Sequence, residues 1–426
     1  MSMQNKQAIT LLFLANIISG LAQGISMVAI PWYFVKVVEL PELFASAYII
    51  ITFLTLFWGL YAGTLIDRYS RKKLFIIINV VCGVSIGSIA MYGFQIGDLS
   101  NFLVILVFGI TIFNYNVHYP NLYAFGQEIT EPKNYGKLNS YIEVQGQTTS
   151  VLAGAFAALL LTGTQNNILE IAGFSFTLPF DIKAWEIYEV FLMDAITYIA
   201  VIFIFLLIKY NPIIQEKVHK GNLFSRLEGG IQYLKNNPII FVFGLLSYML
   251  FAFTLVEVHV ILPSYVHKFL QMDGNIYASA EIYYSIGAIC SGFLVLRVFR
   301  KINTVSSIII LLVVVSFAFY GMAMYKLLWI FFLGNLILGI ANAGVRILRT
   351  TYIFNHIPNN LIGRANSVFN SLNIIIRMIM IGAFSLPFFN IDDNIRYGYF
   401  VGVGLMFLTL ILLIFWYKRI ISAEKN

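Results

Sequence analysis

Charged residues are scarce in this chain. Asp, Glu, Lys and Arg make up 11% of its 426 residues, whereas hydrophobic residues make up 59%. A soluble protein needs far more polar surface than this composition supplies, so a soluble fold is excluded. Apolar runs of about 20 residues, long enough to cross a bilayer, recur along nearly the whole sequence. We therefore predict a polytopic protein embedded in a lipid bilayer.

Cysteine is also rare: Cys82 and Cys290 are the only two, and both lie inside expected helices. We interpret them as small core residues rather than as a disulfide or a metal site, and we expect no metal. The first apolar run continues into Pro31 without a small-residue cleavage site. We therefore expect a spanning helix there and not a cleaved signal peptide.

Motifs of membrane enzymes are missing as well. The chain has no phosphate-binding Walker loop and no His-x-x-Glu-His metal motif, so we do not expect an enzyme. A sensor without transport would need an appended signalling domain, and both tails are too short for one. We expect no cofactor, although coupling to protons is considered below.

The net charge of +7 is explained by the placement of the basic residues, most of which lie on one side of the membrane. We place 21 of the 27 Lys and Arg residues in the tails and in loops on the side of Arg68. Five fall on the other side and Arg377 lies within a helix; the five are Lys36, Lys183, Lys268, Lys326 and Arg396. This bias indicates a multi-pass protein of the inner, or cytoplasmic, membrane with both termini in the cytoplasm, and it argues against nucleic-acid binding.

Twelve spanning helices are expected from the apolar runs. They lie near 10–37, 43–66, 74–95, 101–125, 136–162, 187–209, 238–268, 275–298, 304–325, 327–352, 363–389 and 396–417. We predict an N-terminal six-helix bundle (1–209), a cytoplasmic linker (210–237) and a C-terminal six-helix bundle (238–426). In the linker, Leu223, Leu227, Ile231 and Leu234 recur at helical spacing and predict an interfacial amphipathic helix.

The two halves contain an internal repeat. The segment Gly136-Lys-Leu-Asn-Ser140 matches Gly363-Arg-Ala-Asn-Ser367, 227 residues later. The spacing of Gly63, Leu65, Arg68, Arg71 and Lys72 recurs in Gly292, Leu294, Arg297, Arg300 and Lys301, 229 residues later. Two matches at nearly the same offset indicate twin bundles of related topology.

One short loop gathers charge between two apolar runs: Gly63-Thr-Leu-Ile-Asp67-Arg68-Tyr-Ser-Arg71-Lys72-Lys73. We expect Gly63 to allow close helix contact and Asp67 to accept from backbone N–H groups at a helix start. The plain alternative is a basic loop that only fixes orientation. The pattern resembles the signature loop between the second and third helices of the major facilitator superfamily, with Ser70 where that family has Gly.

This resemblance covers the whole chain and implies the major facilitator fold. That fold is an all-α membrane protein of twelve transmembrane helices in two pseudo-symmetric six-helix bundles, which rock to open a midplane site to one side at a time. The family role of the loop makes Gly63, Asp67, Arg68, Arg71 and Lys72 candidate gating residues. The signature loop, the 120–140 region and Phe191-Leu-Met-Asp194-Ala-Ile-Thr-Tyr198 resemble the macrolide-efflux and enterobactin-exporter branch.

Ionisable residues inside spans are costly and mark function by default. The candidate coupling charges are Glu143, Glu257, Glu281 and Arg377. Arg377 cannot lose its proton, so we expect Glu257 or Glu281 as its partner. A static ion pair and a titrating, coupling pair both stay open. Asp194 and Glu281 lie near helix ends, where they could simply reach interfacial water.

Other polar residues share helix faces that line the cavity in the resembling family. The candidate cavity residues are Asn16, Gln23, Asn114, His118, Glu257, His259, Asn335 and Asn342. Some of them are expected to form interhelical hydrogen bonds instead. Asn370, Asn373 and Arg377 form one further stripe, on the eleventh helix. The implied cavity is mostly apolar and aromatic, which suits a bulky amphiphile.

We therefore predict a monomeric secondary-active transporter that exports an amphiphilic small molecule, such as a drug or a siderophore, by rocker-switch alternating access. Proton coupling is an open option, because the fourth helix lacks the Arg typical of proton antiporters. The alternative is a lipid or lysophospholipid transporter, or a small-solute importer of the same fold. The external loop 163–186 could cap the cavity mouth or be an ordinary amphipathic connector.

Overall fold

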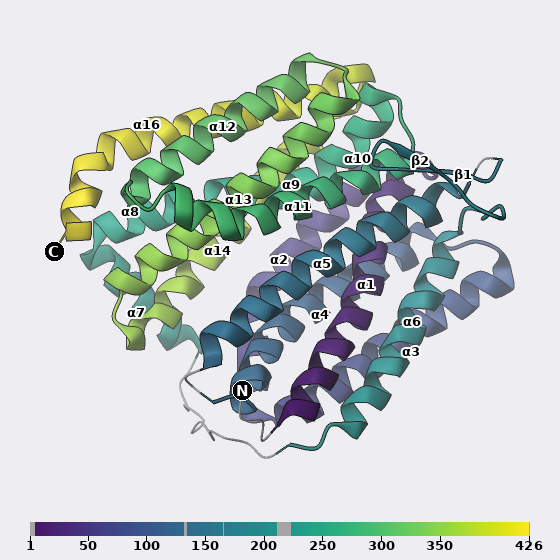
Figure 1. The fold of residues 1–426 in the computed structure, drawn as a ribbon, viewed down its shortest axis with the longest axis horizontal. Coiled ribbons are helices and arrows are strands. Elements are labelled where there is room, and N and C mark those ends of the chain that lie inside the picture. The colour runs from purple at the N-terminus through teal and green to yellow at the C-terminus, as the bar shows by residue number, and fades with distance from the viewer. Residues whose placement is uncertain (1–4, 132–133, 165, 211–222, 426) are drawn as a thin grey trace. The chain divides into compact units, whose positions relative to one another are not determined.

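The computed structural model describes residues 5–131, 134–164, 166–210 and 223–425. The described part contains twelve helices long and apolar enough to cross a membrane, as predicted. Ten of them are single helices (Figure 1): α1 (Lys6–Lys36), α2 (Pro41–Arg68), α3 (Arg71–Ile96), α4 (Asn101–Glu128), α5 (Tyr135–Thr162), α6 (Ile187–Leu207), α11 (Gly274–Val298), α12 (Thr304–Met324), α13 (Leu328–His356) and α14 (Asn359–Phe384).

The other two spans are composite. The seventh runs through α8 (Pro238–Ser247), α9 (Met249–Val256), η2 (Glu257–Ile261), α10 (Leu262–Ser264) and η3 (Tyr265–Leu270). The twelfth runs through η4 (Asp392–Arg396) and α16 (Tyr397–Lys425), after the short α15 (Pro387–Asn390). Both η2 and η3 are π-helical, and such bulges release backbone groups and re-aim side chains, often at functional positions.

The chain folds into two compact units that exchange short segments. Unit 1 comprises Met1–Val37, Leu54–Lys220 and Gly274–Ser279, and unit 2 comprises Val38–Phe53, Gly221–Asp273 and Ala280–Asn426. The first part of α2 therefore packs with unit 2, and the first turn of α11 packs with unit 1. The division predicted from the sequence assigns 1–209 to one bundle and 238–426 to the other, without exchanged segments. That division stays a prediction.

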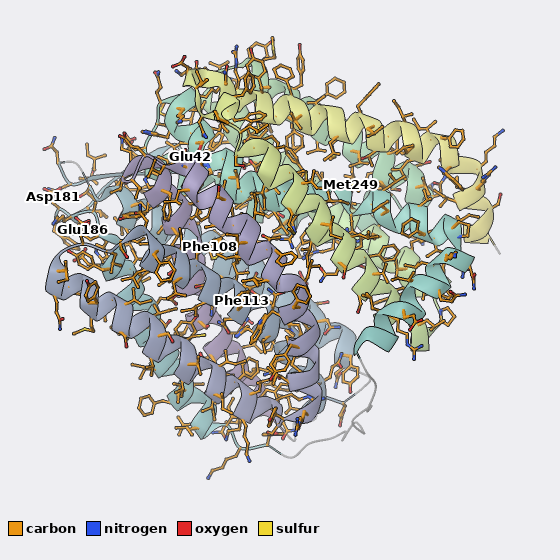
Figure 2. The ribbon with its side chains drawn as sticks, turned by 180° about the vertical axis from the view of Figure 1, so that it is seen from behind. Glu42, Phe108, Phe113, Asp181, Glu186 and Met249 are labelled. Carbon is orange, nitrogen blue, oxygen red and sulfur yellow. The ribbon has the colours of Figure 1, made fainter. Side chains whose placement is uncertain are left out.

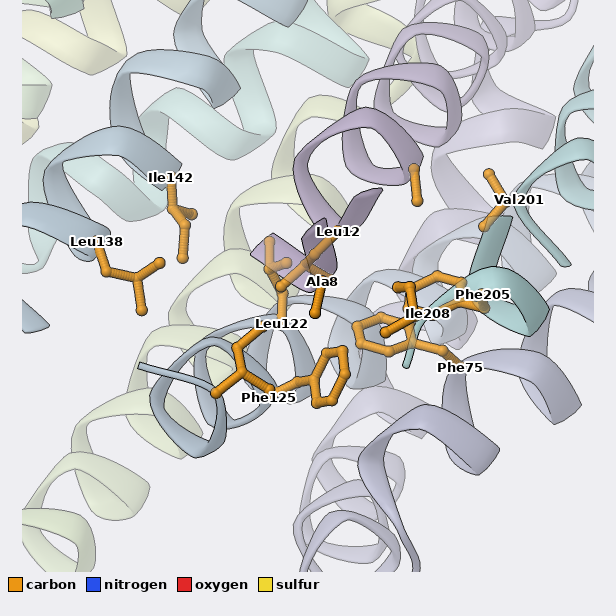
Figure 3. Packing of buried hydrophobic residues seen from close by; sticks show 12 residues of the cluster. Ala8, Leu12, Phe75, Leu122, Phe125, Leu138, Ile142, Val201, Phe205 and Ile208 are labelled. Carbon is orange, nitrogen blue, oxygen red and sulfur yellow. The ribbon is translucent and has the colours of Figure 1, made fainter. Parts of the chain in front are cut away.

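In unit 1, α6 packs along α3 and α1, and α1 also packs along α5 (Figure 1). A cluster of buried apolar residues lies between the starts of α1, α3 and α5 and the ends of α4 and α6 (Figure 3). In it the rings of Phe75 and Phe205 stack at 4.5 Å. Leu138 in this cluster is 1% exposed. Its position in the repeat corresponds to Ala365 of unit 2.

In unit 2, α12 packs along α13 and α16. Ala365 is fully buried in a second apolar cluster with Ile353 and Phe369. The two copies of the repeated segment thus each place a buried apolar residue near the start of a spanning helix. This equivalence supports the internal repeat that the sequence indicates.

The close contact between α11 and α13 depends on two glycines. A Cβ on Gly287 would collide with the carbonyl oxygen of Leu336, and a Cβ on Gly339 would collide with that of Tyr284. Small residues of this kind let helix backbones approach closely in membranes. Gly292, also on α11, has no atom of the described residues within 4 Å of where its Cβ would be.

The linker helix α7 (Leu223–Asn236) confirms the helical spacing that the sequence shows. Leu234 is buried and Leu227 packs against the same cluster of unit 2, whereas Ile231 is 51% exposed. The helix thus packs along α14 with its apolar side.

The predicted external loop forms a β-hairpin, a small departure from the all-α expectation. Strands β1 (Ile168–Ile171) and β2 (Phe174–Thr177) pair antiparallel. Their turn residues Ala172 and Gly173 both have positive φ, as the tightest hairpins require. Ala172 N donates to Ser279 Oγ over 2.8 Å. Figure 2 labels Asp181 and Glu186, which follow the hairpin before α6.

Candidate functional site

The signature loop leads into α3, whose first residues bond the ends of neighbouring helices in unit 1. Arg71 is the first residue of α3, and its Nη1 lies 3.4 Å from Glu128 Oε2 at the end of α4. Asn121 Nδ2 donates to the Arg71 carbonyl oxygen over 3.0 Å. The Tyr210 hydroxyl bonds the Glu128 carboxylate, and burial followed by this negative charge raises the pKa of Tyr210.

Lys72 extends the same junction to the end of α6. Its Nζ donates to the carbonyl oxygen of Ile208 over 2.8 Å and lies 3.4 Å from that of Leu206. A cation at a helix C-terminus binds carbonyls that have no partner in the helix and complements the helix dipole. Lys72 therefore stabilises the end of α6, and Arg71 joins the start of α3 to the end of α4, whatever part the two bases also have in orientation.

The other gating candidates are not engaged in this way. Arg68 is exposed at the end of α2, 5.8 Å from the Tyr69 ring. A Cβ on Gly63 would meet no atom of the described residues within 4 Å, so the close helix contact expected there is not observed among them. The side chain of Asp67 lies outside the described residues, and its latch role stays a prediction.

Several candidate cavity residues of unit 1 bond one another. His118 Nε2 lies 2.8 Å from Asn16 Oδ1, and since that oxygen can only accept, Nε2 carries the hydrogen. Asn114 Nδ2 donates to the Tyr198 hydroxyl over 3.2 Å. These bonds join α1 to α4 and α4 to α6. They follow the interhelical alternative that the sequence left open.

Gln23 and the two tenth-helix candidates are also buried and hydrogen-bonded. Gln23 Nε2 donates to Ser19 Oγ over 2.7 Å, and Asn335 Nδ2 donates to the Phe331 carbonyl oxygen over 2.9 Å. Asn342 Nδ2 donates to the Tyr284 hydroxyl over 2.7 Å. Asn342 therefore joins α13 to α11, and Asn335 bonds within its own helix, whereas Gln23 also bonds the Tyr198 hydroxyl of α6.

Asp194 does not reach interfacial water. Its side chain is fully buried on α6, and Oδ2 accepts from Ser26 Oγ over 3.3 Å. Oδ1 is buried with no hydrogen-bond partner among the described residues. The Tyr198 hydroxyl and Cys82 lie in the same surroundings. Both cysteines are free.

Glu257 is the corresponding buried acid of unit 2. It opens the π-helical turn η2, it is fully buried, and its Oε1 accepts from the Tyr399 hydroxyl of α16 over 2.7 Å. Its Oε2 has no partner within the described structure. The Tyr265 ring lies edge-on to Tyr399, with 4.8 Å between centroids. A lone carboxylate in such a dry aromatic setting is costly when charged.

The remaining acidic candidates are less enclosed. Glu143 is exposed on α5 and accepts from the Tyr123 hydroxyl over 2.9 Å. Glu281 is partly buried on α11, and its Oε1 accepts from Ser285 Oγ over 3.3 Å. Its negative charge reaches Glu257.

Arg377 lies beside Tyr48 rather than beside either acid. Its side chain is hydrogen-bonded to Tyr48, and its charge acts on His259. His259 is 9% exposed, and its ring meets Tyr48 edge-on at 5.5 Å. The expected pairing with Glu257 or Glu281 assumed that a buried cation needs an anionic partner. Instead, Arg377 is bonded to the hydroxyl of Tyr48, from the part of α2 that packs with unit 2.

A second arginine, Arg349, lies inside α13, within the span 327–352 that the sequence predicts, but was not among the candidate residues. It is 5% exposed, and its guanidinium lies 3.6 Å from the centre of the Tyr248 ring. Nη1 donates to the Ser247 carbonyl oxygen over 3.1 Å. Ser247 and Tyr248 mark the break between α8 and α9. Cation–π contact and a broken helix together stabilise this charge.

Among the described residues, no three metal-ligating side chains lie close enough to hold a metal ion. What the residues do provide is two apolar bundles, each with a lone carboxylate buried between its first and last spanning segments. A comparison with family models then matches residues 12–381 to the Major Facilitator Superfamily. The chain belongs to this superfamily.

Solved transporters of related fold match this superfamily member over nearly its full length. The nucleoside transporter NupG shares 13% identity and superposes with a TM-score of 0.70, covering 96% of this chain and 99% of that one. A bacterial homologue of the iron transporter ferroportin, in its inward-facing state, shares 16% with a TM-score of 0.69 over 96% and 98%. A D-xylose-proton symporter shares 12% with a TM-score of 0.67 over 96% and 96%. No curated protein matches the chain by sequence.

Several residues of this superfamily member escaped sequence reasoning. Asp194 was discounted because it lies near a helix end. Its burial could have been inferred from the apolar residues on both sides of it. Arg349 lies within the predicted span 327–352 but was counted with the basic residues of the loops and not as a charge inside a helix. The roles of Tyr48 and Tyr399 could not be predicted, because a tyrosine in an apolar run does not indicate which charged residue its hydroxyl will bond.

Proposed function

We propose that this protein is a secondary-active transporter that exports an amphiphilic small molecule by alternating access, driven by proton uptake at Glu257. The supporting observation is the carboxyl group of Glu257, which is fully buried in a spanning segment with one oxygen bonded and the other unpartnered within the described structure. No cation neutralises it among those residues. Protonation removes the cost of burying the charge, so proton binding and the conformation around η2 are linked.

We infer an amphiphilic substrate from the apolar, aromatic interior of the protein. Around Glu257 the side chains of Tyr265, Phe319 and Tyr399 form an aromatic cluster, and buried charges are few. Such surroundings favour an apolar body with a limited number of polar groups. The motif resemblance to macrolide-efflux and enterobactin exporters supports export of a drug or a siderophore. We place the protein as a monomer in the cytoplasmic membrane, with both termini in the cytoplasm.

Substrate-dependent proton movement in proteoliposomes tests this proposal. A panel of macrolides, siderophores and lysophospholipids would be offered to the wild type and to Glu257→Gln. Proton flux should require a substrate and should be lost in Glu257→Gln, because an amide cannot carry the proton. Asp67→Asn would test the latch, and Glu228→Gln, an exposed acid on α7, makes the same chemical change outside the interior.

Transport without proton flux would remove the antiport mechanism and leave a uniporter or another coupling ion. Transport of lysophospholipid alone would favour the lipid transporter instead. Loss of flux in Glu228→Gln as severe as in Glu257→Gln would show that the effect is not specific to the buried acid.

A further inference from the structure

Unit 2 contains a group of polar side chains that the coupling scheme does not use. Arg377 and Asn373 lie four residues apart on one face of α14. Tyr48, from the part of α2 that belongs to unit 2, is hydrogen-bonded to Arg377, and His259 packs edge-on against Tyr48. We refer to Tyr48, His259, Asn373 and Arg377 as the Arg377 cluster.

The positive charge of this cluster is not balanced by an acid. Within the described part of the chain, no carboxylate lies within ion-pair distance of Arg377. Its Nε is buried without a hydrogen-bond partner. An arginine inside a spanning helix stays charged and is costly without an anion. Tyr48 supplies a neutral oxygen, which satisfies one donor and leaves the charge in place.

Asn373 is a second and independent sign of a missing ligand. Its side chain is 2% exposed, and neither Nδ2 nor Oδ1 has a hydrogen-bond partner in the described residues. A buried amide left unpaired at both atoms is expensive and uncommon. Nδ2 is a donor one helical turn from the guanidinium, so both residues can donate to the same acceptor.

Packing holds the cluster in place. Tyr48 is 2% exposed and its ring stacks with Phe44 at 6.0 Å. Five residues beyond Arg377 along α14, Gly382 leaves room for Ile49, whose Cδ1 lies 3.8 Å from where a Cβ would be. Packing from its own helix and from α14 therefore restrains Tyr48 before any ligand binds, which reduces the entropic cost of binding.

We propose that the Arg377 cluster binds the anionic group, a carboxylate or a phosphate, of an amphiphilic ligand, with Arg377 and Asn373 as donors and Tyr48 as the residue that positions Arg377. This proposal rests on the proposed function for the amphiphilic body of the ligand. A guanidinium matches planar or tetrahedral oxyanions in two-point geometry. A cationic head group would be repelled, and a neutral one would leave the charge uncompensated.

Binding of matched probes tests the proposal without requiring transport. The full chain in phosphatidylcholine nanodiscs would be titrated with pyrenebutyrate and pyrenebutanol, which share an apolar body, and binding followed by fluorescence polarisation against empty nanodiscs. Wild type should prefer the carboxylate. Arg377→Gln should weaken carboxylate binding about 10- to 100-fold and leave alcohol binding nearly unchanged, as expected for one charge-assisted bond.

Variants separate recognition from folding. Arg377→Lys keeps the charge and should retain part of the preference, and Asn373→Ala should lose less than Arg377→Gln. Arg300→Gln removes an exposed arginine of the same unit and should behave as wild type. Equal loss of both probes, or no change in Arg377→Gln and Asn373→Ala, would overturn the proposal.

Replacing phosphatidylcholine by phosphatidylglycerol identifies the source of the anion. Competition by the anionic lipid in wild type, absent in Arg377→Gln, would assign the site to a lipid head group, and absence of competition would assign it to the soluble amphiphile. Probe preference with no proton-coupled transport would contradict the proposed function and leave this site standing. Coupled transport without probe preference would do the reverse.

Discussion

Arg349 carries its charge in the interior of unit 2, stacked on Tyr248 and bonded to a carbonyl oxygen at the break of the seventh span. Glu257 is held in a related way, by the hydroxyl of Tyr399. In both cases an aromatic residue contacts a buried ionisable group that has no oppositely charged partner among the described residues. Such contacts add less Coulomb energy than an ion pair, but they also require only one charge to be desolvated.

Arg349→Lys should destabilise the protein by about 2 kcal/mol, the size of a desolvated cation–π contact. An ammonium group cannot reproduce the planar stack on Tyr248 and the bond to the Ser247 carbonyl together. Thermal unfolding in detergent, followed by tryptophan fluorescence, would measure the change. Arg346→Lys, at an exposed position one turn earlier, is the matched control, and an equal loss there would refute this account.

At the scale of elements, helix contacts in unit 2 are set by where small residues meet backbone. The α11–α13 contact is closest at Gly287 and Gly339, where a Cβ on either would collide with a carbonyl oxygen of the other helix. Backbone atoms cannot move aside as a side chain can, so overpacking here is not relieved locally. The same helix α11 also carries Gly292, where the space is open.

Gly287→Ala should therefore destabilise unit 2 by about 1 to 3 kcal/mol, whereas Gly292→Ala should be neutral or stabilise α11 by about 0.5 to 1 kcal/mol through helix propensity. Both variants insert the same methyl group into the same helix. Their thermal unfolding midpoints, measured by fluorescence-detected size exclusion, should be lower for Gly287→Ala than for Gly292→Ala. Equal midpoints would mean that α11 and α13 are not held by this close approach.

At the scale of the whole molecule, charge and span number make a prediction about orientation. An even number of spans puts both termini on one side, and the excess of Lys and Arg in the loops on that side favours the cytoplasm. The exposed Lys183, in the connection between β2 and α6, then faces outward.

Single cysteines, introduced after both native cysteines are replaced by serine, would check the orientation. Lys183→Cys should react with a membrane-impermeant maleimide in intact cells. Ser422→Cys, exposed near the end of α16, should react only after permeabilisation. The opposite labelling pattern would reverse the orientation and, with it, the direction assigned to export.

The sequence alone determined the twelve spans, the linker helix, the internal repeat and the superfamily. Each of these follows from local properties: apolar length, periodicity, and short motifs that recur at a fixed offset. It also identified Glu257, His259, Asn373 and Arg377, because polar residues are conspicuous in apolar runs.

Partners were decided by the tertiary structure. The bond from Arg377 to Tyr48 depends on the first part of α2 packing with unit 2, an exchange with no signature in the chain. The π-helical turns of the seventh span and the burial of Asp194 are likewise set by packing against neighbouring helices. The sequence shows which residues are polar. Which of these residues contact one another depends on the packing of segments that are far apart in the sequence.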